Sequence, residues 1–125
     1  MKAVLPETCS LVVEWCSYHY GNNLAGIAFF DPTSVDPTYP HGDLNILLVL
    51  HNGPDEDRQR YDIKARMLMN TLLPNQEVKC RIQTVEEINQ LAALQLPLLA
   101  IYLQSSQISF DPWNILQRAQ ATLRK

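Results

Sequence analysis

Two short apolar segments, Leu24–Phe30 and Leu44–Leu50, are separated by Asp43 and by a twelve-residue stretch, 31–42, that contains three prolines. Each segment is bounded by turn residues, as is typical of buried strands. Proline removes a backbone donor and fixes φ, so the connection cannot form a regular helix or strand. Loops of this length inside a compact domain often carry function. The loop 31–42 is therefore a candidate functional region.

The rest of the chain predicts alternating helices and strands. Helical spacing of apolar residues predicts a helix that starts near Pro6 and stops at 21–23, and a second over 55–73 whose acidic first turn suits the helix dipole. Apolar and polar residues alternate over 77–84, which predicts a half-buried strand. Thr84 and Glu87 have the spacing of a capping box and predict a helix through about Leu94. A helix over 96–104, a strand over 108–110 and a helix over 112–124 complete the prediction.

Composition narrows the class of protein. The length of 125 residues fits one domain, 1–125. Thirteen acidic and ten basic residues give a net charge of −3, which argues against a dedicated nucleic-acid binder. No apolar run approaches the ~20 residues of a membrane span, and the N-terminus does not resemble a signal peptide. These features predict a cytoplasmic chain.

Two smaller patterns leave alternatives open. The basic residues of the long helix form either a nucleic-acid face or a solvated helix surface; they are Arg58, Arg60, Lys64 and Arg66. The three cysteines have no CxxC spacing, so a disulfide framework or a zinc site is not expected. Cys9, Cys16 and Cys80 are better explained as small buried residues.

The stretch from Phe30 to Val49 resembles a family signature. It reads FDPTSVDPTYPHGDLNILLV. Minimal nucleotidyltransferases of the DNA polymerase β-like superfamily carry an apolar strand, Phe-Gly-Ser, a loop with a second Gly, and Ser-Asp-x-Asp-Leu-Leu-Val. Without a gap, Phe30 matches the Phe, Asp43 matches the first Asp of the pair, and 46–48 fall on the following apolar strand. The chain therefore resembles a degenerate member of this family.

The resemblance extends over roughly residues 10–112 in the order of elements. The family has a strand with a third Asp, then Thr-x-Glu-Glu and a helix, and the segment CRIQTVEEI at 80–88 is similar to that block. The segment 108–111 is similar to a short strand near the family's C-terminus. The resemblance implies an α/β (α+β) fold with a small mixed sheet packed by helices on one side.

The family's phosphate loop is altered. In nucleotidyl transfer, the Gly-Ser turn places backbone N–H groups against the phosphates, and glycine permits the close approach. Here Asp31 and Pro32 occupy these positions, Ser34 follows in the same vestigial loop, and Asp36 replaces the loop glycine. Asp31 adds negative charge and Pro32 removes a donor, so the loop is expected to bind phosphate poorly.

The family's metal site is altered too. Two Mg²⁺ ions neutralise developing charge in this chemistry, and Mg²⁺ prefers carboxylate oxygens. Asp43 remains, whereas Asn45 replaces the second Asp and Arg81 falls on the third, where it repels a dication and could pair with Asp43. Asp43 is then the candidate metal ligand of a vestigial site, Asp43, Asn45 and Arg81. A shifted alignment leaves open a different metal site at Asp31, Asp36 and Asp43. His41, in the same loop, is either a general base or ligand or an exposed loop residue with neither role.

The predicted function is binding. The altered site predicts a non-catalytic nucleotidyltransferase-fold protein that acts through a partner or a nucleotide. Small members of the family often pair with all-helical proteins in toxin–antitoxin-like operons, so an all-helical partner or a homodimer is expected. The apolar stretch 94–103 is either such a surface or part of the core. The alternatives are a divergent Mg²⁺-dependent enzyme that transfers a nucleoside monophosphate from a triphosphate to a protein or small molecule, and an unrelated α/β domain.

Overall fold

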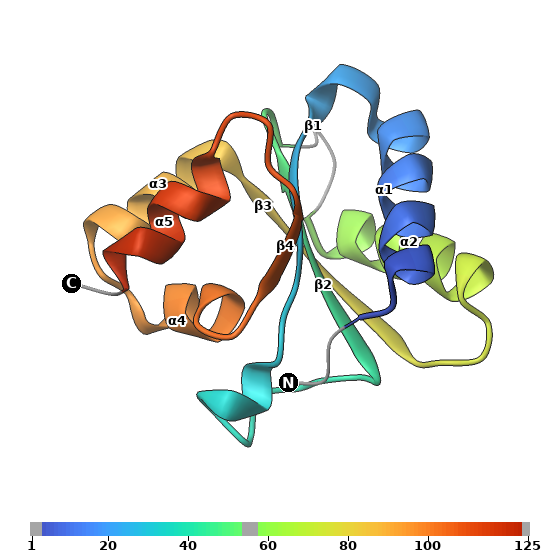
Figure 1. Cartoon of the computed structure of the whole chain (residues 1–125), viewed down its shortest axis with the longest axis horizontal. Coiled ribbons are helices and arrows are strands. Elements are labelled where there is room, and N and C mark those ends of the chain that lie inside the picture. The colour runs from blue at the N-terminus through green and yellow to red at the C-terminus, as the bar shows by residue number, and fades with distance from the viewer. Residues whose placement is uncertain (1–3, 54–57, 124–125) are drawn as a thin grey trace.

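A mixed sheet divides the structure into two helical layers (Figure 1). The computed structural model describes residues 4–53 and 58–123. Within these ranges, four strands and five α-helices follow in the order α1 (Pro6–Tyr20), β1 (Leu24–Phe29), β2 (Leu44–Leu50), α2 (Arg58–Leu72), β3 (Val78–Thr84), α3 (Val85–Ala93), α4 (Pro97–Leu103), β4 (Gln107–Phe110) and α5 (Ile115–Thr122), with short 3₁₀ turns at η1 (Gly21–Asn23) and η2 (Pro32–Ser34). The predicted mixed α/β architecture is confirmed.

The sheet has the strand order β3-β2-β1-β4. β1 lies antiparallel to both β2 and β4, whereas β2 and β3 are parallel. The β2–β3 register runs from Leu44 opposite Val78 to Leu50 opposite Thr84. β3 and β4 are therefore the outer strands, and β2 presents its N-terminal end beside the start of β3.

Helices cover both faces of the sheet, so the prediction that they pack on one side is wrong. Ile46 and Leu48 face a core that includes residues of α1 and α2. Leu47 and Val49 face a second core that includes residues of α3, α4 and α5. Every residue of β2 is buried. Successive side chains of a strand point to opposite faces, so a strand that is apolar at successive positions buries both faces.

The helix boundaries agree with the sequence patterns except at the last helix. α5 begins at Ile115 because Asn114 has a left-handed φ of 58°, and the Asp111 carboxylate accepts hydrogen bonds from the N–H groups of Leu116 and Gln117. The predicted acidic first turn at 55–57 lies outside the described residues. No helix in the described ranges combines the length and the apolar character needed to cross a bilayer.

The predicted capping box is confirmed and also joins two helices. Thr84 N–H donates to Glu87 Oε1 at 2.9 Å, and Glu87 N–H donates to Thr84 Oγ1 at 3.1 Å. Arg58 at the start of α2 pairs with the same Glu87 carboxylate at 2.8 Å. The contact links α2 to α3 around the C-terminal end of β3.

The α4 part of the stretch 94–103 contributes to the core. Leu99, Tyr102 and Leu103 are buried, while Leu94 and Leu96 are exposed. The core interpretation of this segment is therefore the better one.

The three cysteines are free thiols, and Cys9, which was predicted to be buried, is only half-buried. Cys16 and Cys80 are buried, and burial raises the pKa of both thiols.

Candidate functional site

The proline-rich loop is held by hydrogen bonds to its own aspartates. Asp31 Oδ1 accepts from the N–H and the hydroxyl of Thr33 at 3.2 and 2.6 Å. Asp36 Oδ1 accepts from the N–H and the hydroxyl of Thr38 at 3.0 and 2.7 Å. Such contacts are typical of aspartates that stabilise turns. The hydrogen bonds from Thr38 also lower the pKa of Asp36.

The segment predicted to be a vestigial phosphate loop forms a closed 3₁₀ turn, η2. Pro32 is buried at its start. The Ser34 hydroxyl donates to Asp31 O at 2.9 Å, and the Ser34 N–H donates to the same carbonyl at 3.4 Å. The Thr33 and Ser34 N–H groups therefore already have acceptors within the loop.

At the start of β2, the surviving site residues bind the backbone of the chain. Asn45 Oδ1 accepts from Gly42 N–H at 3.0 Å, and its amide donates to Gly42 O at 3.3 Å. Asp43 Oδ2 accepts from Glu77 N–H at 3.0 Å. A Cβ at Gly42 would lie 2.6 Å from Glu77 O, so only glycine fits between the loop and β3. These contacts fix the end of the loop to the start of β3.

Arg81 lies away from Asp43, so their predicted pairing is wrong. Arg81 Nε donates to Tyr39 Oη at 3.2 Å, and the guanidinium lies 5.7 Å from the centroid of the Tyr39 ring. The register explains the separation, because Arg81 is opposite Leu47 in the middle of β2, whereas Asp43 bonds to Glu77 before β3 begins. In the described part of the chain, Arg81 and Asp43 form no ion pair.

The donor set does not fit a pair of Mg²⁺ ions. A cavity of about 220 Å³ brings together Asp31, His41, Asp43 and Asn45. Both carboxylates already accept hydrogen bonds from the chain, and His41 Nδ1 lies 3.0 Å from Tyr39 O. Across residues 4–53 and 58–123, no three His, Cys, Asp or Glu side chains are grouped as metal ligands would be. Mg²⁺ sites rely on such carboxylate groups.

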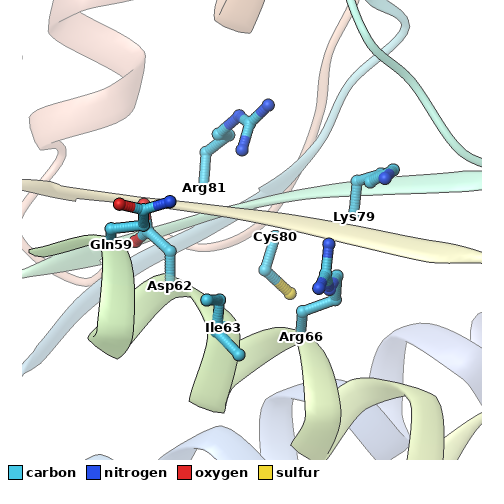
Figure 2. Close-up of a pocket in the computed structure, with 7 residues that line it drawn as sticks. All are labelled: Gln59, Asp62, Ile63, Arg66, Lys79, Cys80 and Arg81. Atoms are coloured by element: carbon cyan, nitrogen blue, oxygen red, sulfur yellow. The ribbon is translucent and has the colours of Figure 1, made fainter.

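A second cavity, which the sequence analysis missed, lies between α2 and the outer edge of β3 (Figure 2). Its volume is about 310 Å³. We call it the α2–β3 groove; it is lined by Gln59, Asp62, Ile63, Arg66, Lys79, Cys80 and Arg81. Lys79 and Arg81 extend from one face of β3, and α2 supplies Asp62 and Arg66 from the other side of the strand (Figure 2). Three cationic side chains and one carboxylate thus surround one opening.

Side chains of α2 cap the outer edge of β3 at both ends. Arg58 Nη1 donates to Ile82 O at 2.8 Å, and Asn70 Oδ1 accepts from Val78 N–H at 3.2 Å. Backbone groups of a strand alternate in direction with a period of two residues. Cys80, midway between these positions, therefore directs its N–H and C=O toward the same outer edge, where the groove lies.

Asp62 is the acidic member of the groove, and one of its oxygens is unpaired. Its Oδ1 is buried and has no hydrogen-bond partner among the described residues. Burial raises the pKa of Asp62, while the charges of Arg58 and Arg81 act in the opposite direction. The net shift is upward, so the fold disfavours the ionised carboxylate.

Replacing Asp62 by Asn is expected to raise the Tm at about pH 7 and to have little effect below about pH 4. A carboxyl with a raised folded-state pKa stabilises the fold while it is protonated, and that stabilisation is lost as the pH rises through the folded-state pKa. The substitution removes the ionisation. Thermal denaturation of both proteins across this pH range measures the difference. A lower Tm for Asp62→Asn at neutral pH would mean that attraction to the arginines outweighs burial.

Comparison with known proteins gives a structural match without a sequence match. The sequence matches no known protein family and no curated protein. Among solved structures, the chain is similar to one from a toxin–antitoxin with AMP-PNP, with a TM-score of 0.57 and 8% sequence identity. The match covers 93% of this chain and 84% of that one. A structural match at so low a sequence identity shows only that the two chains share a fold. The shared fold is consistent with a small α+β nucleotidyltransferase-like domain.

Proposed function

We propose that this chain is a non-catalytic protein of nucleotidyltransferase-like fold that acts by binding a protein partner. The observation that carries the proposal is the state of the three positions where the resemblance expects metal-binding carboxylates. Asp43 accepts a hydrogen bond from Glu77 N–H just before β3, Asn45 is hydrogen-bonded to the backbone of Gly42, and Arg81 donates to the Tyr39 hydroxyl. The side chains at all three positions are therefore used in hydrogen bonds within the protein. This arrangement favours binding over metal-dependent transfer.

The structural neighbour supports a partner of a particular kind. That neighbour is a toxin–antitoxin protein, and the family resemblance implies small nucleotidyltransferases that pair with all-helical proteins. The partner we propose is therefore a separate all-helical chain in a toxin–antitoxin-like pair, and a homodimer is the second possibility. Neither Mg²⁺ nor a nucleoside triphosphate has a part in this proposal.

The alternative function is a divergent Mg²⁺-dependent nucleotidyltransferase that acts on a protein or small molecule. It is favoured by one observation, the shared cavity that contains Asp31, His41 and Asp43. In that case the metal ligands would be Asp43 Oδ1 and Asp31 Oδ2, the oxygens that do not accept from Glu77 and Thr33.

The two functions differ in their response to nucleotide. We expect millimolar ATP with MgCl₂ to shift the Tm by less than about 1 °C, because a ligand stabilises a fold only by binding to it. Thermal denaturation with MgCl₂ alone provides the baseline. Asp43→Asn is the matched variant, because its amide oxygen can still accept from Glu77 N–H. A rise of several degrees that Asp43→Asn abolishes would overturn the proposal and favour the enzyme.

The partner itself is tested by purification and reconstitution. The tagged full-length chain, recovered from its native host, is expected to carry one protein in a fixed stoichiometry by native mass spectrometry. The same complex should form again from the two separately purified chains. If the chain is recovered as a monomer and no purified candidate binds it, the proposed function fails.

A further inference from the structure

We propose that the α2–β3 groove binds an acidic polypeptide segment of the partner. This inference rests on the proposed function, and it specifies the contact surface and the chemistry of the segment. Carboxylates of the segment would meet Arg66, Lys79 and Arg81, and its backbone N–H groups would face Asp62. The groove lies at the outer edge of the sheet, separate from the loop cavity around Asp43.

The charge of the groove argues for an acidic occupant. Arg66 and Arg81 form no ion pair with any residue of the described ranges. Lys79 lies 3.6 Å from Glu77, whose side chain is 63% exposed, and such surface pairs contribute little. The whole chain has a net charge of −3, so this positive cluster is a local feature of an acidic protein. Complementary charge guides association and sets specificity.

The Asp62 carboxylate in the lining of the groove favours a polypeptide over a free phosphate. A free phosphate concentrates its negative charge in one small group, and that group would be repelled by a second anion inside the same opening. A polypeptide carries separate carboxylates and N–H donors along its length, so it can place its carboxylates at the three cations and an N–H group on the side of Asp62.

Exposed apolar side chains extend the same surface along α2. Ile63, which lines the groove, is 41% exposed, and Met67, one helical turn further on, is 62% exposed. Residues four apart lie on one face of a helix. An acidic segment with apolar side chains would use both parts of the surface, whereas an inorganic anion would use neither apolar residue.

The inference is tested with a fluorescein-labelled peptide of alternating Glu and Leu residues and fluorescence anisotropy at low salt. Arg66→Glu is expected to weaken binding about fivefold or more, and Arg66→Gln by a smaller factor, because reversal of a surface charge adds repulsion. Arg118→Glu makes the same change of charge at an exposed position of α5 and is expected to leave binding within about twofold. A Lys and Leu peptide should not bind.

Several outcomes would overturn the inference. Equal weakening by Arg66→Glu and Arg118→Glu would mean that net charge alone attracts the peptide. If inorganic phosphate displaces the peptide when its negative charge matches that of the peptide's carboxylates, the groove is a simple anion site. A homodimer that Arg66→Glu disrupts would make a second copy the occupant. If a reconstituted complex with the partner forms equally well with Arg66→Glu and the unaltered chain, the proposed function stands and this contact surface is wrong.

Discussion

Leu47→Ala and Leu48→Ala are each expected to lower the free energy of unfolding by about 2–5 kcal/mol, the range for a leucine truncated in a well-packed core. The two leucines are neighbours in β2, and each is 0% exposed. Their side chains enter different cores, Leu47 beneath α3, α4 and α5 and Leu48 beneath α1 and α2. Urea denaturation of the two variants measures both losses on one scale.

Exposed Leu94 provides the control for this pair. It is 68% exposed, so Leu94→Ala is expected to change the unfolding free energy by less than about 0.5 kcal/mol. A sheet covered by helices on one side only would make one of the two β2 substitutions as mild as this control. That result would contradict the two-layer arrangement.

Asn45→Asp, which restores a carboxylate at the family's position, is expected to destabilise the fold by about 1–3 kcal/mol at neutral pH. Asn45 is buried, and its amide donates to Gly42 O. An ionised carboxylate cannot donate there, and it would place a negative charge against a carbonyl oxygen. Restoring the acid therefore removes a contact that holds the loop.

The loss of stability in Asn45→Asp should become smaller as the pH falls, because a protonated carboxyl can donate to Gly42 O again. Burial and the carbonyl are expected to raise the pKa of the new group in the fold, so its stabilising form is lost as the pH rises through that pKa. Urea denaturation of the variant and the unaltered chain at about pH 4 and about pH 7 measures the change. If the Asn45→Asp variant and the unaltered chain have the same free energy of unfolding at neutral pH, the hydrogen bond from Asn45 to Gly42 O contributes little to stability.

Much of the fold could be predicted because local patterns determine it. The apolar runs of β1 and β2, the alternation in β3, and the Thr84 capping box each reflect hydrogen bonds or burial within a few residues. The two-layer packing was not predicted, because which helix returns to which face depends on the tertiary topology. The signal was present in β2, whose residues are apolar at every position from Ile46 to Leu50.

The candidate site was predictable in its positions and less so in its contacts. Asp43 and Asn45 lie at the start of β2 as expected, but the partner of Arg81 depends on the β2–β3 register, which no local pattern specifies. The α2–β3 groove was missed for a similar reason. Lys79 and Arg81 resemble the solvent side of any half-buried strand until the topology makes β3 an edge.

The capping of β3 by α2 has a consequence for the behaviour of the protein at high concentration. An uncovered outer strand offers its backbone to strands of other molecules, which is a common route to aggregation. Here Arg58 and Asn70 already occupy outward groups at Ile82 and Val78, and the opposite outer strand, β4, has only four residues. Both borders of the sheet are therefore poor templates for intermolecular strand pairing, and a chain with so apolar a central strand can remain dispersed.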